Sequence, residues 1–325
     1  MPLTFDMPMP ELVLYQGANP RPDDFDAFWD RGLEKMQRTN PRIERVPAEF
    51  QTTFARCEHL YFTGVGGARI HAKLILPENR KRPHPAVLMF HGYGTHSGDW
   101  MDKLAYAAEG FVVAAMDCRG QGGRSEDTGG VTGTTCMGHI VRGLAGDPDQ
   151  ILFRRIFLDT AQLAGIVMNM DEVDENELVV TGSSQGGGLT LACAALEPRI
   201  KKAAPVYPFL CDYKRVWDLD LDRQAYQELR DFFRNHDPLH EQETEIFTRL
   251  GYIDVQHLCP RIHAEVFMGI GLMDEICPPS TQFAAYNKIR SPKSLALYPD
   301  FAHEDLPGHP DKIFTFLTDR NRPSI

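Results

Sequence analysis

The segment Gly182-Ser183-Ser184-Gln185-Gly186 has the spacing G-x-S-x-G, which is typical of a nucleophilic serine. It follows the apolar run Leu178-Val179-Val180 and precedes a helical pattern, so it falls at a strand-to-helix turn. On such a turn, side chains two residues before and after the serine would collide with neighbouring backbone, and glycine removes them. We therefore predict that Ser184 is a nucleophile above the sheet edge. The amide N–H of Gln185, at the start of the helix, would face a developing oxyanion.

A serine nucleophile needs a base and a group that orients this base. When the serine lies on such a turn, the chain order is serine, then Asp or Glu, then histidine. Asp274 and His303 follow in this order, and each comes directly after an apolar run of strand length. Because the carboxyl ends of parallel strands meet at one sheet edge, we expect Asp274 and His303 to meet Ser184 there. Glu275 is the alternative acid.

Other polar groups near these positions receive different roles. We expect Glu304 and Asp305 to organise the loop around His303, since adjacent side chains rarely point at one place. The loop Phe90-His91-Gly92-Tyr93-Gly94 follows another apolar run, and the amide of Tyr93 is the expected second oxyanion donor. The Tyr93 ring is a candidate wall of the acyl pocket; the alternative is a tight loop with an aromatic lid and no catalytic role.

The elements that must position these groups alternate along the chain. Residues 55–63 and 68–76, around the glycine-rich turn 64–67, predict a β-hairpin. Further strands are expected at residues 86–90, 111–116, 178–180, 202–206, 264–268 and 295–298. Helices are expected at residues 99–109, 153–170, after Gln185, 279–288 and 309–320. This order predicts an α/β fold with a mostly parallel, doubly wound sheet covered on both faces.

Two segments stand outside this alternation. Residues 1–50 form an N-terminal extension in which Asp23 and Asp24 can cap a helix, with Phe25, Phe28, Trp29 and Met36 on its docking face. Residues 212–256 are charged, aromatic and helical in pattern, and resemble an inserted cap. We expect both to belong to a single domain spanning residues 1–325.

Composition excludes several classes of function. The 325 residues carry 34 basic and 45 acidic side chains, a net charge of −11, which is a poor basis for binding a nucleic-acid backbone. We read neither a secretory signal nor a membrane-spanning run. The seven cysteines are scattered and lack C-x-x-C spacing, so we expect buried thiols and a cytoplasmic location. His91 and His96 lack a convincing third ligand, so we expect neither a metal nor another cofactor.

Four motifs together resemble a known family. They are Arg119-Gly120-Gln121, the run from Gly182 to Gly188 around Ser184, His303-Glu304, and the stretch 271–287 beginning Gly271-Leu272-Met273-Asp274. Gly120, Gln121, Gly186 and Glu304 are part of these motifs. In all four motifs the chain resembles the acetyl xylan esterases and cephalosporin-C deacetylases. These form carbohydrate esterase family 7, a branch of the α/β-hydrolases. The resemblance covers essentially the whole chain, although residues 131–139 and 145–150 do not match residue by residue.

The resemblance implies Ser184 as nucleophile, Asp274 as acid, His303 as base, and the Tyr93 and Gln185 amides as the oxyanion hole. It implies a metal-independent cytoplasmic deacetylase that acts on short acetylated xylo-oligosaccharides and on cephalosporin C. It also implies a homohexamer, a dimer of trimers, whose active sites face an inner chamber. Arg119 could contact substrate, but we expect a structural role in which its guanidinium braces the nucleophile loop.

Other functions remain as alternatives. A broad acyl esterase, a thioesterase or a serine peptidase would use the same three residues. Peptidases of this type usually add a large propeller domain, for which 325 residues leave no room. A non-catalytic binding protein of the same fold typically loses one of the three groups, whereas Ser184, Asp274 and His303 all stand here in order.

Overall fold

A computed structural model describes residues 5–78, 83–127 and 135–319. Three expectations fall partly outside this range: the first four residues of the N-terminal extension, residues 131–134 of the unmatched stretch, and the last residue of the final expected helix. In the described chain, nine strands form one sheet in the order β1-β2-β3-β5-β4-β6-β7-β8-β9. The strands are β1 (Glu44–Pro47), β2 (Ala55–Thr63), β3 (Arg69–Pro77), β4 (His84–Phe90), β5 (Val112–Met116), β6 (Val173–Ser183), β7 (Lys202–Val206), β8 (Glu265–Gly271) and β9 (Lys293–Tyr298).

The expected parallel sheet is confirmed from β5 to β9. Each neighbouring pair from β5 through β4, β6, β7 and β8 to β9 runs parallel, whereas β1, β2 and β3 are antiparallel to their neighbours. The predicted hairpin is β2 and β3, paired from Ala55 with Pro77 to Thr63 with Arg69. Strand β5 and residues 86–90 of β4 are continuous apolar runs, as expected for parallel strands with helices on both faces.

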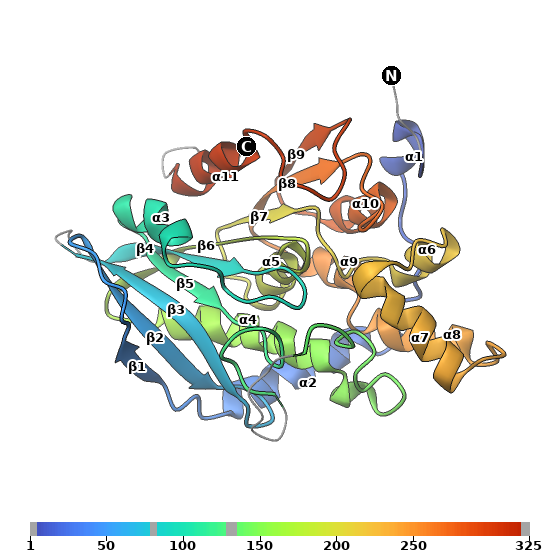
Figure 1. Ribbon diagram of the computed structural model, residues 1–325, viewed down its shortest axis with the longest axis horizontal. Coiled ribbons are helices and arrows are strands. Elements are labelled where there is room, and N and C mark those ends of the chain that lie inside the picture. Colours follow the sequence, from blue (N-terminus) through green and yellow to red (C-terminus); the bar gives the residue numbers. More distant parts are fainter. Residues whose placement is uncertain (1–4, 79–82, 128–134, 320–325) are drawn as a thin grey trace.

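The helices lie on the two faces of the sheet and at one end of the molecule (Figure 1). They are α1 (Met9–Leu12), α2 (Phe25–Arg38), α3 (Leu104–Ala108), α4 (Leu152–Met168), α5 (Gln185–Leu196), α6 (Tyr213–Asp218), α7 (Gln227–His236), α8 (Glu243–Gly251), α9 (Val255–Leu258), α10 (Pro279–Lys288) and α11 (His309–Thr318). Short 3-10 turns lie at Met101–Lys103, Pro148–Gln150, Gln224–Tyr226 and Cys259–Arg261.

Two hydrophobic cores result from this layering. The smaller core includes Tyr106 of α3 and Ile313 of α11, packed on one face of the sheet. The larger core includes α4 and α5 on the opposite face, together with residues of α2, α10 and the insertion. None of the helices in the described ranges is both long and apolar enough to cross a lipid bilayer.

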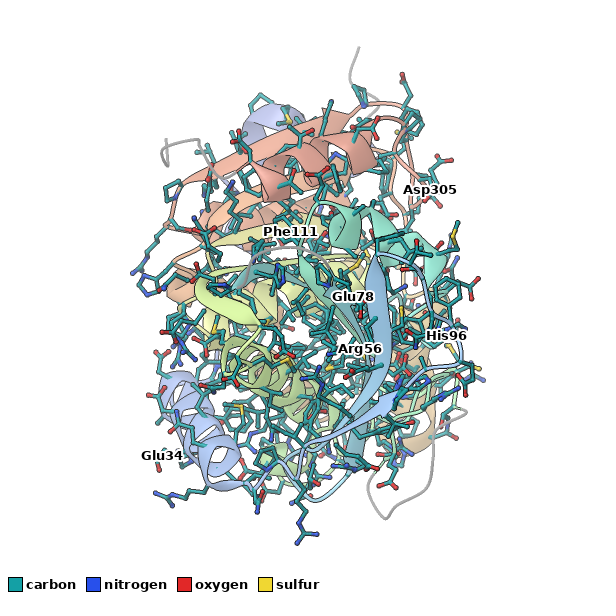
Figure 2. All side chains as sticks on the ribbon, turned by 90° about the vertical axis from the view of Figure 1, so that its left-hand side faces the viewer. Glu34, Arg56, Glu78, His96, Phe111 and Asp305 are labelled. Atoms are coloured by element: carbon teal, nitrogen blue, oxygen red, sulfur yellow. The ribbon has the colours of Figure 1, made fainter. Side chains whose placement is uncertain are left out.

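The N-terminal extension docks as predicted. Phe25, Phe28 and Trp29 of α2 are buried, and the Trp29 ring stacks on Phe157 of α4 with 5.8 Å between centroids. The outer side of α2 carries charged residues, and Figure 2 shows Glu34 there, pointing away from the sheet. Asp24 occupies the N-cap position, but its side chain makes no capping hydrogen bond. The predicted cap is therefore wrong in this detail.

Helices α6, α7 and α8 of the insertion group together at the right of Figure 1, far from β1–β3, whereas α9 lies against α5 and α10. The N-terminal extension holds this group through Asp212, whose carboxylate accepts hydrogen bonds from the Tyr15 hydroxyl (2.8 Å) and the Asn19 amide (2.7 Å). Asp6 likewise receives bonds from Arg215 of α6 and the Ser280 amide of α10, each at 2.6 Å. The extension and the insertion therefore fix each other against the sheet.

Several boundaries differ from expectation. Strand β6 begins at Val173, five residues before the predicted start, because residues 174–177 are polar and separate Val173 from the apolar part that the sequence pattern detects. Strand β1 was not expected, since its residues Glu44–Pro47 are half-exposed or exposed at the sheet edge. The segment expected as a helix over 99–109 is a 3-10 turn followed by the short helix α3.

Candidate active site

Ser184 lies between the last residue of β6 and the first residue of α5, with φ 56° and ψ −120°. A positive φ is costly for a residue other than glycine, so the surroundings must hold it. The Ser184 amide donates to the Val206 carbonyl of β7 (3.0 Å), and the Ser184 carbonyl accepts from the Gly188 and Phe209 amides (3.0 and 2.9 Å). These bonds hold the serine in this strained conformation at the carboxyl edge of the sheet.

The glycines on either side of Ser184 are required by close backbone contacts. A Cβ on Gly182 would lie 2.6 Å from the carbonyl oxygens of Gly186 and Phe90. A Cβ on Gly186 would lie 2.1 Å from the Phe90 carbonyl oxygen. The colliding backbone therefore belongs to the turn itself and to the end of β4, the neighbouring strand.

Ser184, His303 and Asp274 form a continuous chain of hydrogen bonds. The Ser184 Oγ lies 2.9 Å from His303 Nε2, and His303 Nδ1 lies 2.8 Å from Asp274 Oδ2. In the tautomer that satisfies both contacts, the serine hydroxyl donates to Nε2 and the ring N–H on Nδ1 donates to the carboxylate. The side chain of His303 is 19% exposed and that of Asp274 is fully buried, so only the serine end of the chain is open to a substrate.

Asp274 is fixed by the loop that carries it. Its Oδ1 accepts from the amides of Ile276 (2.9 Å) and Cys277 (2.8 Å), and its Oδ2 accepts from Gln282 Nε2 (3.3 Å) as well as from His303. The neighbouring Glu275 is exposed, and its carboxylate lies 3.4 Å from Arg223. The structure thus brings Asp274, and not Glu275, to the histidine.

The amide groups of two glutamines link the nucleophile turn to the loop after β4. Gln121 Nε2 donates to Gln185 Oε1 (2.8 Å), and Gln185 Nε2 lies 3.0 Å from Gln121 Oε1. The same Gln121 oxygen accepts from the Gly94 amide at 2.9 Å. Because both glutamines are fully buried, this arrangement holds the Tyr93 loop in register with the start of α5.

His91 also belongs to this loop. Its Nδ1 lies 2.7 Å from the Gly92 carbonyl, and its Nε2 accepts from the Cys118 amide at 2.9 Å. Burial lowers the pKa of His91, which favours the neutral ring that these two contacts require. Both ring nitrogens are therefore engaged within the protein and neither is directed at a ligand.

The Arg119 guanidinium braces a different part of the molecule from the one predicted. Its Nε and Nη2 donate to the two carboxylate oxygens of Asp159 in α4, each at 2.6 Å, and its Nη1 donates to the Val65 carbonyl at 3.0 Å. Both charged side chains are completely buried. Arg119 has the expected structural role, but its guanidinium joins α4 to the β2–β3 turn. The contact to the nucleophile turn comes from Gln121 instead. Gly120, between them, has a φ of +74° that lets the chain turn.

Glu304 is exposed, and its Oε1 accepts from the Ala302 amide at 3.0 Å. It therefore organises the histidine loop and does not compete with Asp274. Figure 2 shows Asp305, from the same loop, along the same right-hand edge of the molecule as His96, from the loop after β4. These two loops, which follow β9 and β4, border the site.

A cavity of about 400 Å³ opens at Ser184. Its wall is formed by the end of β4, the nucleophile turn and two side chains near the serine, and it comprises Met89, Phe90, Gly92, Thr181, Gly182, Ser183, Tyr207 and His303. The Tyr207 ring lies 4.6 Å from the His303 ring, centroid to centroid. Sequence reasoning missed Tyr207, although its position directly after β7 is a signal that could have identified it.

The Tyr93 side chain does not belong to this wall. Its hydroxyl donates to the carboxylate of Glu228 in α7 and accepts from the His139 amide at 2.9 Å. Burial and the Glu228 charge raise the pKa of Tyr93. The expectation that the ring lines an acyl pocket therefore gains no support from the cavity. Glu228 was missed because one acidic residue in a charged helical segment carries no distinctive sequence signal.

One group of side chains in the described ranges could hold a metal ion: Asp274, Cys277 and His303, whose ligand atoms lie within 4.8 Å of one another. The chemistry of these donors does not suit a metal. Burial raises the pKa of the Cys277 thiol well above its ordinary value, and only the thiolate is a good ligand. Both oxygens of Asp274 are already occupied by hydrogen bonds. The geometry favours a hydrogen-bonded acid–base chain.

Comparison with known proteins identifies the family of the chain. The family model described as acetyl xylan esterase matches residues 1–320. Acetyl xylan esterase 1 from Thermoanaerobacterium sp. JW/SL YS485 is 59% identical, with a TM-score of 0.94 over 98% of this chain and 100% of that one. The acetyl xylan esterase from Paenibacillus sp. R4 is 33% identical, with a TM-score of 0.89 over 96% of this chain and 99% of that one.

More distant relatives are informative in other ways. The acetyl esterase Axe7A of Xylanibacter ruminicola is 27% identical over 305 residues, which are 90% of this chain, and the chain spans 66% of that protein's length. The α/β hydrolase GrgF from Penicillium sp. sh18 is 16% identical, with a TM-score of 0.57 over 80% of this chain and 96% of that one, and shows the shared fold alone. The chain therefore belongs to the acetyl xylan esterase family of serine esterases, which have the α/β-hydrolase fold.

Proposed function

We propose that this protein removes acetyl groups from small acetylated sugars, xylo-oligosaccharides among them, and from cephalosporin C, through an acetyl-enzyme on Ser184. The observation that carries the proposal is the hydrogen-bonded chain from Ser184 through His303 to Asp274, found in a member of the acetyl xylan esterase family. The similarity to the Thermoanaerobacterium enzyme over the whole of both chains supports acetylated xylan fragments as substrates.

In the first half of the reaction, His303 Nε2 takes the hydroxyl proton as Ser184 Oγ attacks the acetyl carbonyl carbon. Asp274 stabilises the resulting imidazolium and holds the ring in the required tautomer. The carbonyl oxygen becomes an oxyanion facing the Tyr93 and Gln185 amides, and one such donor is worth about 3–4 kcal/mol in the transition state. The bond to the sugar oxygen then breaks, and His303 returns the proton to the leaving alcohol.

The second half repeats these roles with water. His303 takes a proton from water, whose oxygen attacks the acetyl carbonyl carbon, and the same two amides stabilise the oxyanion. The bond to Ser184 Oγ breaks, the proton returns to the serine, and acetate leaves. The cavity of about 400 Å³ at Ser184 lies within the range of small-molecule pockets.

A panel of initial rates tests the substrate assignment. Acetylated xylobiose, cephalosporin C and p-nitrophenyl esters from acetate to butyrate should be compared, with a peptide p-nitroanilide as the matched amide. We expect acetyl esters to have the highest kcat/KM and the amide to be inert at the same enzyme concentration. A higher kcat/KM for butyrate than for acetate would refute the acetyl preference, and rapid cleavage of the amide would favour a peptidase.

Family membership also supports two proposals on the state of the protein. We propose that it assembles as a homohexamer, a dimer of trimers, and light scattering after size-exclusion chromatography should then give the mass of six chains. We further propose a cytoplasmic location, supported by seven cysteines that all have free thiols, six of them buried. Cell fractionation with an antibody against this protein would test it.

A further inference from the structure

Glu228, in the first turn of α7, is a buried carboxylate that contacts the loops around the site. Its side chain belongs to the insertion and is 4% exposed. One carboxylate oxygen accepts from the Tyr93 hydroxyl and the Gly138 amide (3.3 Å). The other accepts from the amides of Ile140 (2.8 Å) and Val141 (3.1 Å). Four donors from two separate loops thus converge on one acidic side chain.

Tyr93 is held at both ends by these contacts. Its hydroxyl lies between the Glu228 carboxylate and the His139 amide, and its ring packs edge-on against Phe209, with 5.4 Å between centroids. Phe209 in turn donates its amide to the Ser184 carbonyl. At the other end, the following residue, Gly94, is held by Gln121. The orientation of the Tyr93 peptide unit therefore depends on where its ring is held.

The chemistry of Glu228 suits this task better than simple packing. A buried carboxylate is costly unless hydrogen bonds compensate its charge, and the hydrogen bonds to Glu228 come from the Tyr93 hydroxyl and three backbone amides. Burial raises the pKa of Glu228, and the bonds from Tyr93 and the three amides oppose this shift. An apolar side chain would fill the same space but leave three backbone N–H groups unpaired, so the acceptor is specifically required.

We propose that Glu228 is a positioning residue of the acyl-transfer site, through which helix α7 of the insertion sets the Tyr93 amide against the oxyanion. The proposal rests on the proposed function, since it assumes that this amide is an oxyanion donor. It assigns to the insertion a part in catalysis as well as in covering the sheet. Because α7 lies far along the chain from the oxyanion loop, the contact also couples the docking of the insertion to the rate of the chemical step.

The test compares three variants with the wild-type protein. Glu228→Gln removes the charge and one acceptor oxygen, so that its NH₂ group faces either the Ile140 and Val141 amides or the Gly138 amide and the Tyr93 hydroxyl. Tyr93→Phe removes the same contact but leaves the three backbone N–H bonds to Glu228 in place. Asp231→Asn is the matched control, because it removes one carboxylate charge from an exposed position on the same helix. The readouts are kcat and KM on p-nitrophenyl acetate, and hydrogen exchange of the peptides containing residues 92–95 and 138–141.

In Glu228→Gln, we expect the backbone amide hydrogens of both peptides to exchange faster. We also expect kcat to fall by about 10- to 100-fold, which is less than the effect of losing an entire oxyanion donor. KM should change less than about threefold. Tyr93→Phe should lower kcat to a similar extent, and the double variant should be no worse than the poorer single variant, since both changes break one contact. Asp231→Asn should behave as wild type.

A folded Tyr93→Phe or Glu228→Gln variant with wild-type kcat would overturn the proposal, as would strictly additive losses in the double variant. Should Glu228→Gln fail to fold, Tyr93→Phe alone decides. Failure of the proposed function gives a different result, namely a wild-type protein that neither hydrolyses acetate esters nor reacts with a fluorophosphonate at Ser184. Hydrogen exchange would still show in that case whether Glu228 holds the two loops.

Discussion

Replacing Arg119 by methionine is expected to lower stability and to leave substrate affinity unchanged. The guanidinium and the Asp159 carboxylate are both completely buried and share two hydrogen bonds of 2.6 Å. Arg119 also donates to the Val65 carbonyl at 3.0 Å. It contributes no side chain to the wall of the cavity at Ser184. Arg119→Met therefore removes a brace between α4 and the β2–β3 turn and leaves Asp159 as an unpaired buried charge.

The size of the expected loss of stability follows from the burial of the Arg119–Asp159 ion pair. Breaking a buried ion pair by removing one partner costs about 3–5 kcal/mol, because the remaining charge stays desolvated. At about 2.1 cal/mol/K per residue, unfolding a chain of 325 residues has an entropy of about 0.7 kcal/mol/K. A loss of about 4 kcal/mol therefore corresponds to a Tm about 6 °C lower.

The assay combines thermal unfolding with kinetics on p-nitrophenyl acetate. Arg119→Met should lower Tm by about this amount, with KM within about twofold of wild type. The double variant Arg119→Met/Asp159→Leu should recover most of the loss, since an apolar pair needs no charge compensation. A tenfold rise in KM with an unchanged Tm would refute the reasoning and indicate that Arg119 contacts substrate.

Three further changes test other parts of the structure. Asp274→Asn should lower kcat by roughly 10³–10⁴-fold without a large change in Tm, because the amide favours the wrong His303 tautomer; a kcat within tenfold of wild type would contradict this role. Gly186→Ala should lower both kcat and Tm, since its Cβ would lie 2.1 Å from the Phe90 carbonyl oxygen, and wild-type values would contradict the contact. His309 is 1% exposed, neither of its ring nitrogens has a hydrogen-bond partner among the described residues, and burial lowers its pKa from 6.5 to about 4. Neutral His309 therefore supports the fold above pH 6.5, and this support is lost as the pH falls toward 4. In denaturant unfolding, the loss of stability between pH 8 and pH 5 should be about 2 kcal/mol smaller in His309→Leu than in the wild-type protein, and an equal loss in the two proteins would count against the assignment.

Much of the fold could be predicted because its strands are buried on both faces. Runs such as residues 86–90 and 111–116 are apolar throughout, and the expected boundaries agree with β4 and β5 to within two residues. Strand β1 and the first half of β6 could not be found this way, because their exposed polar residues carry no apolar pattern. Pairing with neighbouring strands, and not local sequence, determines these parts.

The residues of the site also differ in whether the sequence alone could predict their roles. Ser184, Asp274 and His303 could be placed together because each follows a strand whose carboxyl end reaches one sheet edge. The Gln121–Gln185 amide pair and the carboxylate of Glu228 could not, since their roles depend on contacts between segments 64 and 135 residues apart. Arg119 shows the same limit: its structural role was predictable from its chemistry, whereas its partner Asp159 was not.

The most direct test of the account is the fate of Ser184 during turnover. Wild-type protein and Ser184→Ala should be compared for p-nitrophenyl acetate hydrolysis and for fluorophosphonate labelling, with the modified residue located by peptide mass spectrometry. We predict labelling at Ser184 alone, and a folded Ser184→Ala variant that is unlabelled and slower by several orders of magnitude. Wild-type-like hydrolysis by that variant, or labelling at another residue, would contradict an acetyl-enzyme on Ser184.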